Sequence, residues 1–181
     1  DFTVTVRHKP RYVDIHKCTS CGDCVKVCPV DLPDRFQMGL STHKAVYKVA
    51  PRAIPNAYLL EKGDYCLDCR KCQEICPTKA INLGEEEWLE EINVGAIILA
   101  VGYNLFNPQE SEEYGYGRYP NVFTSIEFER LCSPTGPTEG HIILADGRQP
   151  QSVAIIHCVG SRDKNYHEYC SRVCCMHALK Y

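Results

Sequence analysis

The feature that most constrains this chain is a run of four cysteines and a proline that occurs twice. The first run spans residues 18–29 and the second spans residues 66–77, and each reads C-x2-C-x2-C-x3-C-P. The chain holds 13 cysteines among 181 residues, an odd count, and its first residues lack the basic and apolar segments of a secretory signal. A disulfide framework is therefore disfavoured, and thiolates that bind metal are the better interpretation.

The spacing within each run matches the ligands of a [4Fe–4S] cluster. Three cysteines at two-residue intervals can wrap one cube, and in this pattern the fourth cysteine of each run ligates the other cluster. The first predicted ligand set is Cys18, Cys21, Cys24 and Cys76, and the second is Cys66, Cys69, Cys72 and Cys28. The proline that closes each run should hold the cysteine before it in an extended conformation. Zinc is the simpler alternative, but one run alone would already fill a zinc site.

A third group of cysteines lies near the end of the sequence: Cys158, Cys170, Cys174 and Cys175. Because two of them are adjacent, this group is not a third copy of the run. Three interpretations stay open from the residues alone. The group could hold a third, non-standard [4Fe–4S] cluster, it could bind zinc together with His157 or His177, or Cys174 and Cys175 could form a redox-active thiol pair.

The pattern of apolar residues outside the cysteine runs predicts a mixture of strands and helices. Alternation over residues 2–6 predicts a half-buried strand. Continuous apolar runs at residues 94–102 and 153–156 predict strands buried on both faces, as in a parallel sheet. A capping-box signature predicts a helix over residues 124–132, and a last helix is expected within residues 171–181.

Charge, hydropathy and glycine spacing argue against several classes of protein. The formal net charge of -3 provides no basic excess for binding a nucleic-acid backbone. The longest apolar run, residues 96–101, is far too short to span a membrane. No GxGxxG turn is present, so we expect neither a nicotinamide cofactor nor FAD bound by this chain alone. The missing initial Met predicts a chain that is processed or cut from a longer one.

Four further stretches, taken with the cysteine runs, carry a resemblance to a known family. They are KPRYVD (residues 9–14), YGYGRYPN (114–121), CVGSRD (158–163) and YCSRVCCM (169–176). Together they make the chain similar to the A subunits of heterodisulfide reductases, the iron–sulfur flavoproteins of methanogens and related anaerobes. The last two stretches are very specific to that family, whereas the cysteine runs alone are shared with many ferredoxins.

The resemblance implies an α+β fold in which a bacterial-type 2[4Fe–4S] ferredoxin domain is inserted in an α/β flavoprotein framework. That framework is of the Rossmann type, similar to thioredoxin reductase, and is only partly present in this chain. The implied segments are a strand of the flavin domain (residues 1–11), the ferredoxin domain (12–86), a returning part of the FAD domain (87–150) and the start of a second Rossmann-like domain with the extra cysteines (151–181). The resemblance also implies that Gly102 lies near FAD, and it favours a third [4Fe–4S] cluster on Cys158, Cys170, Cys174 and Cys175.

The function implied by the resemblance is the relay of single electrons between [4Fe–4S] clusters and the FAD of the intact protein. The relay would serve flavin-based electron bifurcation coupled to disulfide reduction in the cytoplasm. Implied partners are the iron–sulfur small and disulfide-reducing subunits of heterodisulfide reductase, a hydrogenase or formate dehydrogenase, and ferredoxin. Two alternatives are a stand-alone ferredoxin-type carrier that docks a partner, and a thiol–disulfide enzyme that uses Cys174 and Cys175.

Overall fold

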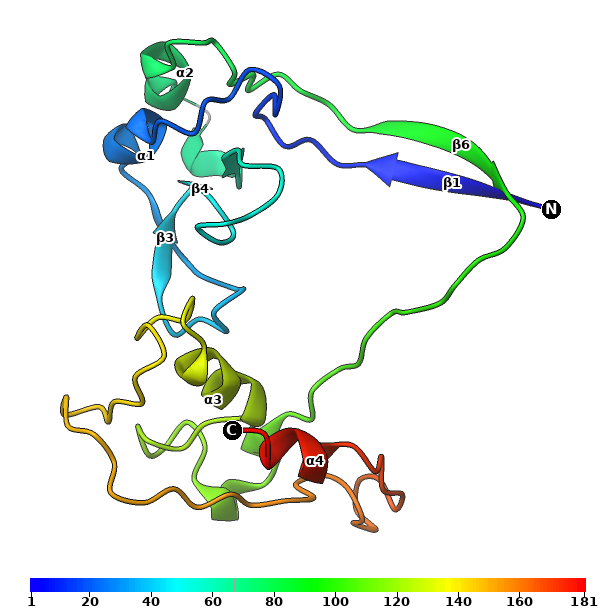
Figure 1. Ribbon diagram of the computed structural model, residues 1–181, viewed down its shortest axis with the longest axis vertical. Coiled ribbons are helices and arrows are strands. Elements are labelled where there is room, and N and C mark those ends of the chain that lie inside the picture. Colours follow the sequence, from blue (N-terminus) through cyan, green and yellow to red (C-terminus); the bar gives the residue numbers. More distant parts are fainter. Residues whose placement is uncertain (67) are drawn as a thin grey trace. The chain divides into compact units, whose positions relative to one another are not determined.

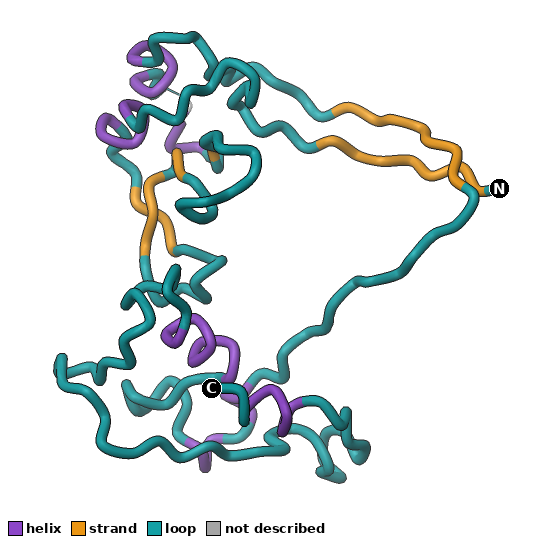
Figure 2. The backbone as a smooth tube through the Cα atoms, viewed as in Figure 1, coloured by secondary structure: helices purple, strands orange, loops and turns teal. Residues whose placement is uncertain are grey.

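The computed structural model describes residues 1–66 and 68–181, which form two compact units. The first unit comprises residues 1–36 and 42–101, and the second comprises residues 37–41 and 102–181. The helices and strands are short (Figure 1), and loops make up most of the chain (Figure 2). Because short elements bury little apolar surface, each unit depends strongly on local packing and on any group that it binds.

The first and last strands of unit 1 form an antiparallel ribbon. β1 (Phe2–His8) pairs with β6 (Trp88–Val94), with His8 opposite Trp88. Half-buried and exposed residues alternate along β1, which confirms the strand predicted over residues 2–6. The His8 ring stacks on the Trp88 ring with 3.8 Å between centroids. The chain between the two strands therefore leaves the ribbon and returns to it at neighbouring points (Figure 1).

Each cysteine run folds into a loop that leads into one short helix. α1 (Asp23–Val27) contains the third cysteine of the first run, and α2 (Lys71–Ile75) contains the third cysteine of the second run. Both helices end at the fourth cysteine, where Cys28 has φ −73° and ψ 119° and Cys76 has φ −68° and ψ 112°. These extended conformations confirm the prediction made from the prolines that follow, since a proline disfavours helical geometry in the preceding residue.

Two further antiparallel strand pairs lie in the segment that connects the cysteine runs. β2 (Asp31–Pro33) pairs with β3 (Thr42–Lys44), and β4 (Val46–Tyr47) pairs with β5 (Leu59–Leu60). A 3-10 turn, η1 (Asp64–Cys66), then leads into the second run. These short strands supply several of the apolar side chains that pack between the two cysteine runs.

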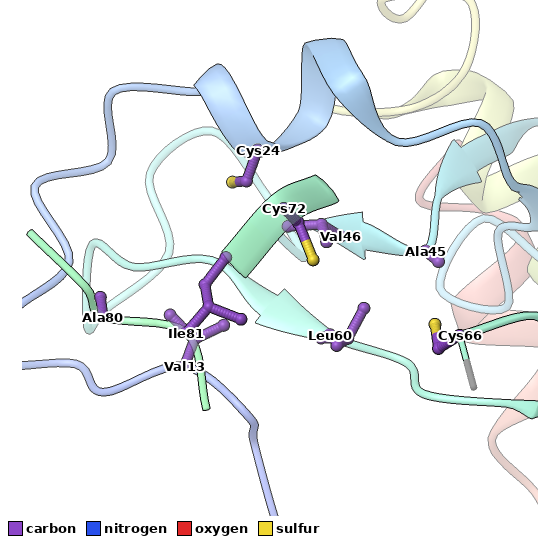
Figure 3. Packing of buried hydrophobic residues seen from close by; sticks show 9 residues of the cluster. All are labelled: Val13, Cys24, Ala45, Val46, Leu60, Cys66, Cys72, Ala80 and Ile81. Atoms are coloured by element: carbon purple, nitrogen blue, oxygen red, sulfur yellow. The ribbon is translucent and has the colours of Figure 1, made fainter. Parts of the chain in front are cut away.

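The core of unit 1 mixes small aliphatic residues with cysteines (Figure 3). Its buried members are Val13, Cys24, Ala45, Val46, Leu60, Cys66, Cys72, Ala80 and Ile81. A bridge between Val13 and Ile81, reinforced by a 2.8 Å hydrogen bond from Asp14 N–H to Ala80 O, joins the approach to the first run with the exit from the second. Because cysteines form part of so small a core, the packing of unit 1 is tied to whatever their sulfurs bind.

The second unit contains α3 (Ser125–Cys132), whose predicted capping box is present. Glu127 N–H donates to Thr124 Oγ1 (3.3 Å), and Thr124 N–H donates to Glu127 Oε2 (2.6 Å). The buried Glu127 carboxylate also accepts a 2.7 Å hydrogen bond from the Tyr116 hydroxyl. The other elements of this unit are η2 (Pro108–Glu110), η3 (Glu112–Tyr114) and the short helix α4 (Cys174–Ala178).

Two of the predicted strands are absent. β6 ends at Val94, and residues 95–102 continue as a loop in which Ile98 is 92% exposed and Val101 is 90% exposed. Residues 153–156 are likewise an exposed loop. A strand buried on both faces needs neighbouring strands and covering helices, and the part of the chain that the structure describes provides neither at these segments. The prediction of two buried strands is therefore wrong for this chain.

Candidate metal centre

The four cysteines of the first predicted set line one small apolar pocket. The lining includes Cys18, Cys21, Cys24 and Cys76, with Val13, Tyr58, Pro77 and Ile81 among their neighbours. Three of these cysteines come from the first run, and Cys76 comes from the end of the second run. The structure therefore brings together the four cysteines of the first predicted ligand set, in which the fourth ligand comes from the other run.

The loop of the first run needs glycine at one position. Gly22, directly before α1, has φ 87°, a left-handed conformation that residues with a Cβ rarely adopt. A Cβ at this position would lie 3.3 Å from the Tyr58 hydroxyl. The tyrosine thus packs closely on the turn between Cys21 and Cys24, where a larger residue at position 22 would strain the backbone.

Cys28 lies with the cysteines of the second run. Burial is the main cause that raises the pKa of the Cys72 thiol, and negative charges on Cys28, Cys66 and Cys69 raise this pKa further. Such charges act strongly only over short distances. Desolvation is the main cause that raises the pKa of the Tyr65 phenol, and negative charges on Glu61, Cys66 and Cys28 raise it further. The second predicted set is therefore also gathered in one place.

Burial and hydrogen bonding give the thiols different acidities. Desolvation raises the pKa of Cys24 to about 12, and the charge of Cys18 adds to this. Desolvation also raises the pKa of the Cys76 thiol, but a 3.3 Å hydrogen bond from Ala80 N–H and hydrogen bonding with Thr78 outweigh it, so the pKa is lowered overall. Metal ligation needs the thiolate, so binding would release protons from these cysteines.

The outer side of the second run borders an open, polar depression of about 610 Å³. Its lining is Pro29, Asp64, Tyr65, Asp68, Cys69, Arg70, Lys71 and Glu74. Charges of both signs therefore surround the half-buried Cys69. The pocket of the first set differs, because apolar side chains predominate among its neighbours.

The four C-terminal cysteines also lie close together, in unit 2. Desolvation and then charges on Cys174, Cys158 and Cys170 raise the pKa of the Cys175 thiol. Backbone N–H of Arg172 donates to Cys170 Sγ at 3.4 Å, and the Arg162 guanidinium lies 3.9 Å from Cys158 Sγ. Helix α4 begins only at Cys174, so the last helix is shorter than predicted and Cys170 lies outside it.

Gly102, which the family resemblance places near FAD, lies in a loop. Its φ of 73° is a left-handed turn conformation, and a Cβ at this position would meet no atom within 4 Å. Its proximity to FAD stays a prediction.

Sequence reasoning missed two residues near the first cysteine set, Tyr58 and Lys48. Tyr58 lines the pocket of the four cysteines, and the Lys48 ammonium lies 5.8 Å from the centre of its ring. Both residues come from the connection between the cysteine runs, where no spacing pattern points to a ligand or a neighbour of one. Only the folded chain brings them to the site.

Within the described residues, no three His, Cys, Asp or Glu side chains converge as the ligands of a single metal ion would. A [4Fe–4S] cube differs from a single ion, because each cysteine binds a separate iron and the four sulfurs need not meet at one point. None of the helices that the structure describes has the length and hydropathy of a membrane span.

A family comparison matches residues 10–77 to a 4Fe-4S dicluster domain. Both cysteine runs lie within this match, so they form an iron–sulfur domain of the ferredoxin type. Over 99% of its length the chain is 48% identical to the A subunit of H(2):CoB-CoM heterodisulfide,ferredoxin reductase from Methanothermobacter thermautotrophicus. The chain is homologous to a segment of the heterodisulfide reductase A subunits.

Other proteins of this heterodisulfide reductase family give the same result. Over 99% of this chain, identity is 47% to the iron–sulfur A subunit of CoB–CoM heterodisulfide reductase from Methanocaldococcus jannaschii. It is 42% to the A subunit of ferredoxin:CoB-CoM heterodisulfide reductase from Methanosarcina mazei. The chain spans 28% of the length of the first two relatives and 23% of the third.

Proposed function

We propose that this chain is the electron-transfer segment of an iron–sulfur flavoprotein of the heterodisulfide reductase type. The observation that carries the proposal is the exchange of fourth cysteines between the runs: Cys76 lines the pocket of the first run, and Cys28 lies with the second. Two [4Fe–4S] clusters in a ferredoxin-type domain require this arrangement. Each cluster would supply a centre that takes up or releases one electron at a time.

The side chains at the two sets suit such clusters. Cluster 1 would be held by Cys18, Cys21, Cys24 and Cys76, and cluster 2 by Cys66, Cys69, Cys72 and Cys28. The hydrogen bond from Ala80 N–H to Cys76 Sγ stabilises negative charge on sulfur, as a bound cluster would need. Because cluster 1 takes ligands from both runs, it would tie the start of the domain to its end.

A third [4Fe–4S] cluster is proposed on Cys158, Cys170, Cys174 and Cys175. Its support is the mutual proximity of these four thiols and the donors that face two of them, Arg162 and Arg172. Zinc could use the same sulfurs, so the experiment below distinguishes the two metals.

For the domain layout, we propose that residues 12–86 form a ferredoxin domain inserted in a flavin domain. Residues 1–11 and 87–150 would belong to that flavin domain, and residues 151–181 would begin a second Rossmann-like domain. The support is the ribbon of β1 and β6, whose pairing brings the two ends of the insert to neighbouring points.

In the intact protein, the clusters would exchange single electrons with FAD during flavin-based bifurcation coupled to disulfide reduction. Gly102 is the residue of this chain proposed to lie near FAD. The proposed partners are the iron–sulfur small and disulfide-reducing subunits of heterodisulfide reductase, a hydrogenase or formate dehydrogenase, and ferredoxin, all in the cytoplasm. The names of the relatives support the link to disulfide reduction and to ferredoxin, since they name a heterodisulfide and, for two of them, ferredoxin.

The two alternative functions have less support. A stand-alone ferredoxin has no need of the segment after residue 86, yet the relatives match that segment as well. A thiol–disulfide enzyme needs a reactive thiolate, whereas desolvation and then the charges of neighbouring cysteines raise the pKa of the Cys175 thiol. The relay is therefore the function that we propose.

The proposal is tested by counting iron and acid-labile sulfide in the full chain after anaerobic reconstitution. Three clusters would give about 12 iron atoms per chain, and the ferredoxin pair alone would give about 8. A chain that retains fewer than about 4 iron atoms and no sulfide would refute the electron relay.

A double variant, Cys174→Ala with Cys175→Ala, tests the third cluster. We expect iron to fall from about 12 to about 8 atoms per chain, because two ligands of one cube are lost. Cys132→Ala is the matched control, since Cys132 belongs to none of the three sets, and it should leave the iron content unchanged. If both chains hold about 8 iron atoms and the double variant loses only zinc, the group is a zinc site.

A further inference from the structure

Lys48 carries a fixed positive charge in unit 1. It directly follows β4 and is half-buried. Its ammonium donates three hydrogen bonds: to Ser20 Oγ (3.1 Å), to Pro51 O (3.3 Å) and to Asn56 Oδ1 (2.6 Å). All three acceptors are neutral oxygens, so they hold the ammonium in place without cancelling its charge.

Two of the contacts of Lys48 lead directly to the first cysteine set. Ser20 lies in the loop between Cys18 and Cys21. The Lys48 ammonium also lies 5.8 Å from the centre of the Tyr58 ring, and Tyr58 lines the pocket that these cysteines share with Cys24 and Cys76. The charge therefore lies beside one residue that lines the pocket, Tyr58, and is hydrogen-bonded to the loop that carries Cys18 and Cys21.

The other lysines close to this run in sequence have acidic partners. Lys17 pairs with Asp14 at 3.4 Å, and Lys26 pairs with Asp23 at 2.8 Å. Their side chains are 61% and 74% exposed, so water and salt screen them. Lys48 is less exposed than these two lysines and its three acceptors are neutral, so its charge is less screened than theirs.

We propose that Lys48 sets the reduction potential of the cluster on Cys18, Cys21, Cys24 and Cys76, an inference that rests on the proposed electron relay. Reduction adds one electron to the cluster, taken from a low-potential one-electron donor, while the ammonium keeps its proton and no bond at the chain forms or breaks. A nearby positive charge stabilises the added electron, more strongly in a partly desolvated site than in water. Lys48 therefore raises the potential of this cluster.

The test is a redox titration of the full 181-residue chain, reconstituted anaerobically, with the clusters followed by electron paramagnetic resonance. Dithionite is the reductant. In Lys48→Met we expect one midpoint potential to become more negative and that of the cluster on Cys66, Cys69, Cys72 and Cys28 to stay unchanged. Lys48→Arg, which keeps the charge, should retain most of the original potential. Lys26→Met, which removes an exposed lysine paired with Asp23, should shift the potential of the first cluster less than Lys48→Met does.

Iron content separates failure of this inference from failure of the relay itself. Lys48→Met with full iron content and unchanged potentials would overturn the role of Lys48 and leave the relay intact. Lys48→Gln keeps hydrogen-bond donors without the charge. If Lys48→Met binds less iron, the midpoint potential of the first cluster is measured in Lys48→Gln instead. Loss of the cluster in both neutral variants would overturn the inference in favour of a structural role. An unsubstituted chain that assembles no cluster would instead refute the relay.

Discussion

The two cysteine runs have the same spacing, but equivalent residues in them have different surroundings. Gly22 and Arg70 occupy the same position before the helix of each run. Gly22 has φ 87°, whereas Arg70 has φ −114°, so only the first loop requires glycine. The pocket of the first set is mainly apolar, whereas charged residues surround Cys69 of the second. Identical spacing therefore predicts which residues are ligands, but not the field around each cluster.

The exchange of fourth cysteines between runs predicts an unusual effect of Cys76→Ser. We expect this substitution to damage the cluster on Cys18, Cys21 and Cys24, although Cys76 is closer in sequence to the other run. The spectrum of Cys76→Ser should match that of Cys18→Ser and differ from that of Cys69→Ser. Cys132→Ser should leave both clusters intact. A Cys76→Ser spectrum that matches Cys69→Ser would show that each run serves its own cluster.

Tyr116 predicts a loss of stability in alkaline solution. Its hydrogen bond to Glu127, followed by desolvation, raises the pKa of the phenol to about 12. The unfolded chain has a lower tyrosine pKa, about 10. The folded state therefore favours the protonated phenol, and this contribution to the free energy of unfolding is present below about pH 10 and is lost as the pH rises toward 12.

The measurement is a difference titration of phenolate absorbance between the original chain and Tyr116→Phe. The tyrosine absent from the variant should titrate near pH 12 in the folded chain. Titration of that tyrosine near pH 10, the value of a free phenol, would contradict the hydrogen bond.

At the scale of elements, α3 depends on its capping box. Thr124→Ala removes the acceptor for Glu127 N–H, and we expect the free energy of unfolding of unit 2 to fall by about 1 kcal/mol. Denaturant unfolding followed by circular dichroism measures this loss. Ser152→Ala, a comparable change at an exposed residue, is the control. Equal stabilities of the two variants would argue against the capping box.

The elements that could be predicted from sequence are those fixed by local rules. The capping box at Thr124, the alternation in β1 and the extended backbone before Pro29 and Pro77 each depend on neighbours within a few residues. The expected strands at 94–102 and 153–156 depend on partner strands, which local sequence cannot provide. The apolar runs therefore predict segments that favour burial, but they do not predict whether this chain provides the partner strands that would bury them.

The candidate site shows the same division. Ligand spacing grouped Cys76 with the first run and Cys28 with the second, and the structure gathers the cysteines in these groups. Tyr58 and Lys48 reach the first set only because β4 and β5 turn the connecting segment back toward it. No residue pattern in that segment predicts that these two residues lie at the site. Hydrogen bonding and packing, rather than metal ligation, determine their positions.

At the scale of the whole molecule, removal of iron should unfold unit 1 more than unit 2. Cys24, Cys66 and Cys72 belong to the core of unit 1, so loss of a cluster would leave a gap where two cysteine runs meet. We expect an anaerobic iron chelator to abolish most of the ordered structure of unit 1, seen as loss of amide protection in hydrogen exchange. The α3 amides of unit 2 serve as the internal control. Full protection of Val13 and Ile81 after iron removal would contradict this coupling.

The antiparallel pairing of β1 and β6 has a consequence for the history and engineering of this chain. Thr3 and Asn93 are 90 residues apart in sequence, yet their side chains share a 2.9 Å hydrogen bond. If everything between His8 and Trp88 were excised, the two strands could be joined by a two-residue turn such as Asn-Gly, which suits an antiparallel hairpin. The segment between His8 and Trp88 could therefore be inserted into, or removed from, a hairpin of a host protein at the level of the gene. The register of the two strands would stay the same.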